Sequence, residues 1–102
     1  MERRVKLGRE LRKVLGSDNV YFQSPESQKM EYPAIRYSLD GVDTHYADNV
    51  KYSTRRKYMV TLMDYDVDSP VVDKILSAFY HCSFDRFYVA DNLNHWVFIV
   101  YY

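Results

Sequence analysis

The chain has few of the features that usually identify a chemical role. Among its 102 residues there is one cysteine, Cys82, so no disulfide can form within the chain. Its three glycines lie far apart and form no glycine-rich loop of the kind that binds phosphate. Basic and acidic residues are balanced at 14 each, and this balance predicts neither nucleic acid nor an anionic membrane as a partner.

Long apolar segments are missing as well. No run of residues approaches the roughly 20 apolar positions that a membrane-spanning helix needs. The first residues, Met1 to Arg4, are followed by a charged helical pattern rather than an apolar signal region, so we expect no membrane insertion and no secretion. The low cysteine content fits a reducing compartment. The length is that of one ordinary domain, and we expect residues 1–102 to form it.

Aromatic residues, in contrast, are plentiful. The chain has 11 tyrosines, 5 phenylalanines and 1 tryptophan, and 47% of its residues are hydrophobic, as in a globular protein. Tyrosine suits surfaces that a partner covers, because its ring is apolar and its hydroxyl is polar. Aromatic residues also favour β-strands. The composition therefore fits both a β-rich domain and a protein that packs against other subunits.

Hydrophobic periodicity predicts two helices. The first covers residues 3–15 and is ended by Gly16, and the second follows Ser69 as its N-cap and Pro70 as its first residue. The apolar positions that we expect these helices to bury are Leu7, Leu11, Val14 and Leu15 in the first, and Val72, Ile75, Leu76 and Phe79 in the second.

Five strands are predicted from the alternation of side chains, at residues 19–23, 33–40, 55–64, 84–90 and 95–101. Both faces of the third are largely apolar, so we expect it to be central. Asp40–Gly41 predicts a turn, and residues 91–94 predict a hairpin loop. The order α-β-β-β-α-β-β indicates an α+β fold, with both helices on one face of a mainly antiparallel sheet.

Residues 41–54 are polar and follow neither a helical nor a strand period, so we predict a long loop that only a partner orders. A partner could bury Tyr46 and Tyr52 and pair with Arg55 and Arg56 at the rim. The aromatic C-terminal hairpin, with Trp96 and Tyr101, is the second candidate contact. These six residues are the predicted protein interface.

No constellation for catalysis or metal binding is found in the sequence. Asp64, Asp66 and Asp68 alternate as at the start of a calcium loop, but Ser69 and Ile75 stand where that loop needs glycine and a carboxylate. His81 and Cys82 are adjacent and do not match zinc spacing. We therefore expect Cys82 to be a small core or boundary residue and His95 to bond the backbone of its hairpin, and we predict no enzyme, metal or cofactor.

Two clusters of basic residues leave a second function open. One lies on the first helix (Arg3, Arg4, Lys6, Arg9, Arg12 and Lys13) and the other comprises Lys51, Arg55, Arg56 and Lys57, beside Tyr52 and Tyr58. Basic residues between aromatic ones can bind single-stranded nucleic acid. Acidic residues at positions 40, 43 and 48 balance the second cluster, which favours solvated surfaces instead.

Several segments resemble a family of small minor tail proteins of long-tailed bacteriophages and related prophages. They are YPAIRY (residues 32–37), DTHYAD (43–48), KYMVTL (57–62), DVDS (66–69) and CSFDRFYVADNLNH (82–95), and they span nearly the whole chain. The family is similar in position to tail-terminator or tail-completion proteins, which have an α+β fold.

The resemblance implies a structural virion protein without catalytic residues. It implies a ring, typically a hexamer, that caps the tail tube and gives the head a surface to join, located in the tail of a particle assembled in the bacterial cytoplasm. The implied partners are further copies of the chain, the tail tube protein and a head-connector protein. A head-completion or connector protein is the alternative within the virion, and a small nucleic-acid-binding module is the alternative from another class.

Overall fold

The computed structural model describes residues 3–23, 30–47 and 50–102, and for residues 43–47 and 50–54 it describes the backbone alone. Two helices and five strands follow one another as α1 (Arg3–Leu15), β1 (Val20–Phe22), β2 (Ala34–Ala47), β3 (Val50–Asp64), α2 (Val71–Ala78), β4 (Cys82–Ala90) and β5 (Leu93–Tyr101). The predicted α+β class and the predicted order of the elements are confirmed.

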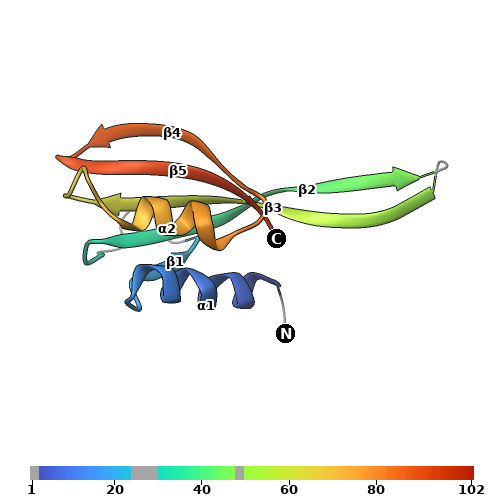
Figure 1. Ribbon diagram of the computed structural model, residues 1–102, viewed down its shortest axis with the longest axis horizontal. Helices are drawn as coiled ribbons and strands as arrows, with labels where there is room; N and C mark the ends of the chain where they lie inside the picture. Colours follow the sequence, from blue (N-terminus) through green and yellow to red (C-terminus); the bar gives the residue numbers. More distant parts are fainter. Residues whose placement is uncertain (1–2, 24–29, 48–49) are drawn as a thin grey trace.

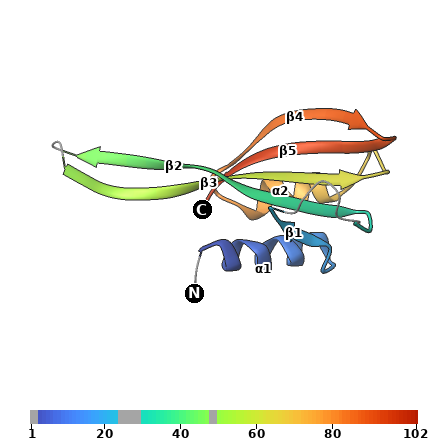
Figure 2. The same cartoon turned by 180° about the vertical axis from the view of Figure 1, so that it is seen from behind.

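The strands form one sheet in the order β1-β2-β3-β5-β4. The short β1 runs parallel to β2, and every other neighbouring pair is antiparallel. As predicted, β3 is the central strand, and both helices lie on the same face of the sheet (Figure 1). The opposite face is seen in front when the molecule is viewed from behind (Figure 2).

The main core is an apolar layer between the helices and the sheet, and a smaller cluster of buried residues, Ala34, Met63 and Leu93, lies apart from it. The main layer follows the alternation of the strands, because every second residue of β2, β3 and β5 points toward the helices. The fully buried members of this layer are Leu7, Leu11, Ile35, Val60, Leu62, Ile75, Phe98 and Val100. Removing the Phe98 ring would cost about 3–5 kcal/mol, as for other large core side chains.

Helix α1 approaches the sheet closely at Gly8. The Tyr37 hydroxyl donates a hydrogen bond to the Arg4 carbonyl at 3.2 Å, which brings the buried ring directly beneath the helix. A β-carbon at position 8 would lie 2.6 Å from the Tyr37 oxygen, closer than real contacts of this kind. The glycine that weakens the helical pattern is therefore required by packing. Gly16 ends the helix as predicted, with a positive φ of 78°.

The predicted loop over residues 41–54 is wrong. Strand β2 continues to Ala47 and β3 begins at Val50. The two strands pair antiparallel from Val42–Arg56 to Ala47–Val50, with one register shift between His45 and Tyr46. The pair extends beyond the rest of the sheet as a two-stranded ribbon (Figure 1). Alternation marks a strand only where one face is buried, so a ribbon outside the core carries no such pattern.

The predicted turn at Asp40–Gly41 is wrong as well. Gly41 pairs with Lys57 inside the strand, and the register shifts between Leu39 and Gly41, as at a β-bulge. The same residue types serve turns and bulges, because both need backbone conformations outside the regular strand.

Three boundaries differ from the sequence analysis. Helix α2 has Pro70 as its N-cap, one residue later than predicted, and the Ser69 hydroxyl accepts a bond from Val71 N at 3.4 Å. Its Leu76 is 38% exposed rather than buried. Strand β4 begins at Cys82, and only Asp91 and Asn92, both with positive φ, connect it to β5.

Replacing Gly8 tests the close approach of α1 to the sheet. Gly8→Ala should destabilise the protein by about 1–3 kcal/mol, as overpacking does, although alanine is the better helix former. Tyr37→Phe removes the clashing oxygen, so the double variant should lose less than the sum of the two single changes. Urea unfolding of all four proteins measures this, and simple additivity would contradict the proposed contact.

Candidate functional site

The ribbon of residues 42–56 is the most prominent surface feature of the molecule. Strand β3 pairs with β5 from Lys57 to Asp64, so among the described strands its first seven residues pair with β2 alone. The molecule measures 50 × 24 × 23 Å, and the ribbon extends along the longest axis (Figure 1). Its base is held by the Lys57–Asp40 ion pair at 3.1 Å.

The predicted interface residues are only partly brought together. Arg55 and Arg56 lie at the base of the ribbon, where Lys57 pairs with Tyr101 in β5. The backbone of Tyr46 and Tyr52 lies in the ribbon itself, and their side chains are outside the described residues. The fold thus places five of the six candidates along the ribbon and at its base.

Trp96 is the exception. It is 7% exposed and lies in the core, where its ring packs against Phe87 with a centroid distance of 5.4 Å. Placing it in a free contact surface is wrong. A high content of aromatic residues does not show which of them lie in the core and which lie at the surface.

A second surface lies along β4, at the edge of the sheet. Phe84 and Phe87 stand opposite Phe98 and Trp96 on the helix-covered face, yet they are 48% and 43% exposed because α2 covers this side incompletely. Val89, Leu76 and Tyr80 are further exposed apolar side chains of β4 and of the α2 region. A register shift between Phe84 and Arg86 interrupts the edge, a device that hinders indiscriminate strand pairing.

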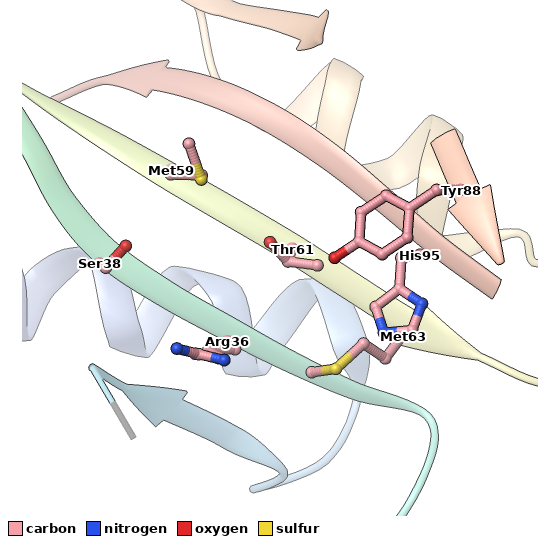
Figure 3. Close-up of a pocket in the computed structure, with 7 residues that line it drawn as sticks. All are labelled: Arg36, Ser38, Met59, Thr61, Met63, Tyr88 and His95. Carbon is pink, nitrogen blue, oxygen red and sulfur yellow. The ribbon is translucent and has the colours of Figure 1, made fainter. Parts of the chain in front are cut away.

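The third surface is a hollow on the open face of the sheet. It has a volume of about 210 Å³ and is lined by Arg36, Ser38, Met59, Thr61, Met63, Tyr88 and His95 (Figure 3). Four different strands supply these residues, and the register places Arg36 opposite Thr61 and His95 opposite Tyr88 and Met63. The lining combines hydroxyls and a guanidinium with two methionine side chains.

His95 has a defined orientation at the end of the hollow. Its Nδ1 lies 2.9 Å from the Leu93 carbonyl, so Nδ1 carries the hydrogen and donates it. The predicted backbone bond of His95 is thereby confirmed. Its ring stacks on Tyr88 with a centroid distance of 4.6 Å and an angle of 10°. In the neutral ring, Nε2 is left as an acceptor.

Charges are segregated over the surface. Helix α1 exposes a row of cations, whereas the segment between β3 and α2 carries Asp64, Asp66 and Asp68. The predicted balance of the second basic cluster is confirmed for Asp40, which pairs with Lys57. The side chains of Asp43 and Asp48 are outside the described residues.

Within the described ranges, no three His, Cys, Asp or Glu side chains gather closely enough to hold a metal ion. None of the helices described is long and apolar enough to cross a membrane. Compared with known proteins, the chain matches no family model and no curated relative.

The half-buried Cys82 thiol gives a test of how β4 packs. Burial raises the pKa of this thiol, so at a given pH less of the reactive thiolate is present than in an unfolded chain. Folding then retains a proton that the unfolded chain loses near pH 8.5, and this contribution to stability falls as pH rises above that value. A thiol reagent should react more slowly with the native protein than with the urea-unfolded protein at pH 8. Equal rates would contradict the described burial.

Proposed function

We propose that the protein is a structural component of a long-tailed bacteriophage tail, which caps the tail tube as a ring and provides the surface that joins the head. The observation that carries the proposal is the β2–β3 ribbon, which extends from the sheet beyond its apolar core. The resemblance of nearly the whole chain to minor tail proteins supplies the biological setting, and the α+β fold is compatible with it.

Ordering the ribbon in the free chain has a large cost in free energy. A two-stranded hairpin is marginally stable in water, because it has no third strand or helix to bury one of its faces. Fixing its backbone costs about 1–2 kcal/mol per residue in conformational entropy. Strand pairing offsets part of this cost, and the burial of apolar side chains by a partner would offset more. A ribbon of this kind is suited to contact the tail tube or a neighbouring subunit.

The distribution of exposed groups supports assembly into a ring. The ribbon, the apolar edge along β4 and the basic helix α1 lie on different parts of the molecule, and they are not copies of one another (Figure 1). Contacts between unlike surfaces repeat from copy to copy and close into a ring when the rotation allows.

Shortening two ribbon tyrosines tests the proposal. Tyr46→Ala with Tyr52→Ala should leave the fold intact, because the ribbon contributes little to the core. Phage carrying the double change should produce tails of uncontrolled length or tails without heads, whereas electron microscopy of wild-type particles should show a closed ring at the end of the tube. Tyr80→Ala is the matched control, since Tyr80 is 94% exposed and lies outside the strands of the ribbon, in the segment between α2 and β4.

The two virion roles give different phenotypes. Loss of length control indicates a tail terminator, whereas tails of normal length that fail to join heads indicate a head-completion protein. If phage with the double variant assemble normally, the ribbon is not the contact surface. Symmetric dimers in place of rings on tails would count against the proposal as a whole.

A nucleic-acid-binding module is the second candidate, because α1 exposes most of its arginine and lysine side chains. Net charge is zero, so we expect weak binding that is lost as salt approaches physiological concentration. Fluorescence anisotropy with single-stranded DNA and RNA measures this. Sub-micromolar binding at physiological salt that is abolished by Arg55→Ala with Arg56→Ala would favour this candidate over the tail protein.

A further inference from the structure

We propose that the hollow on the open face of the sheet receives the acidic segment Asp64–Asp68 of a second copy of the chain. The contact would join the open face of one subunit to the segment that leads into α2 in the next. The inference deepens the proposed ring by naming a subunit contact, but it can be tested on the isolated protein and does not depend on the tail assignment.

The hollow has the chemistry of a carboxylate receptor. Arg36 offers a planar fork of N–H donors, and within the described part of the chain it makes no ion pair. Ser38 and Thr61 add hydroxyl donors, and Tyr88 adds a third near His95 (Figure 3). No aspartate or glutamate lines the hollow. A half-buried guanidinium that shares a hollow with hydroxyls, and that has no anionic partner among the described residues, is best satisfied by a carboxylate from outside.

The hollow also has an apolar component. Met59 and Met63 form part of its lining, and methionine adapts its shape to an apolar partner. A suitable occupant therefore carries carboxylates next to apolar side chains. A free inorganic anion would satisfy only the polar half of the lining.

The segment between β3 and α2 has this composition. Its sequence alternates Asp64, Tyr65, Asp66, Val67 and Asp68, and the two apolar side chains are 64% and 60% exposed. The Asp64 carboxylate accepts a bond from Asp66 N at 3.0 Å, and the Asp66 carboxylate accepts one from Asp68 N at 2.9 Å. These bonds fix the turn in advance, which lowers the entropy lost on binding.

Asp68 is the carboxylate best placed to pair. Within the described part of the chain its carboxylate makes no hydrogen bond or ion pair, unlike those of Asp64 and Asp66. It is exposed and immediately precedes the turn into α2. Its pairing with Arg36 of another copy would supply the anion that the hollow lacks.

The two features lie on different parts of the surface. The acidic segment begins at Asp64, the last residue of β3, and leads over the end of the sheet into α2, and the Asn94 side chain donates a hydrogen bond to its Tyr65 carbonyl at 3.1 Å. Arg36 and His95 line the hollow on the open face. Such a contact joins unlike surfaces, as a ring requires.

Exchange of the two charges tests the contact. Sedimentation velocity of the wild-type chain, up to a concentration on the order of 1 mM, should show species larger than the monomer. Arg36→Glu and Asp68→Arg should each weaken this association by about tenfold or more, because each places like charges face to face. Mixing the two variants should restore it, since every contact in the mixture can again join opposite charges. Circular dichroism checks that both variants are folded.

Two matched controls make the same types of charge reversal at other positions. Arg9→Glu and Asp18→Arg change exposed residues of α1 and of the turn after it, so they should leave the association close to that of the wild type. A wild-type chain that stays monomeric throughout would overturn the inference, as would a mixture that fails to associate. Loss of association in Arg9→Glu but not in Arg36→Glu would assign the contact to α1 and also overturn it.

The outcome is separable from that of the tail proposal. Complementation of a phage that lacks this protein measures tail function independently of self-association in solution. Charge exchange that works in solution without an effect on tails supports the contact and counts against the tail role. If the ribbon variant gives defective tails but the charge exchange fails to restore association, the tail proposal is supported and the contact between Arg36 and Asp68 is contradicted.

Discussion

The structure depends on the apolar layer between two helices and one face of a five-stranded sheet. Leu7 and Leu11 from α1 and Ile75 from α2 meet Val60 and Phe98 there, and all five side chains are fully buried. A chain of this size buries little more than one such layer. The opposite face of the sheet, the ribbon and the edge along β4 are therefore left for water or for partners, and the surfaces discussed for function are those that the core does not reach.

The same layer explains which elements could be predicted from the sequence. Alternation is clear in the parts of β2, β3 and β5 that cover the core, because burial of one face imposes a period of two on apolar residues. It fails over residues 41–54, where the two strands pair with each other beyond the rest of the sheet. The turn predicted at Asp40–Gly41 is a bulge in the structure, because bulges and turns use the same residue types.

The candidate surfaces were less predictable than the fold. Arg55, Arg56 and Tyr101 were found because charge and aromatic content mark them in the sequence, and the register then places them at the base of the ribbon. The hollow has no local signature. Arg36, Thr61 and His95 come from three strands and become neighbours only through strand pairing, which no spacing along the chain reveals.

A net charge of zero conceals how the charges are arranged. Cations gather on α1, a guanidinium stands in the hollow, and carboxylates gather before α2, so the neutral molecule has faces of opposite sign. Exposed ion pairs contribute little affinity, about 0–1 kcal/mol each. They do select the orientation in which two copies meet, because the wrong one brings like charges together. Apolar groups on β4, such as Phe84 and Phe87, could then supply affinity that the charges lack. In an assembly of this kind, polar contacts determine register and apolar contacts determine strength.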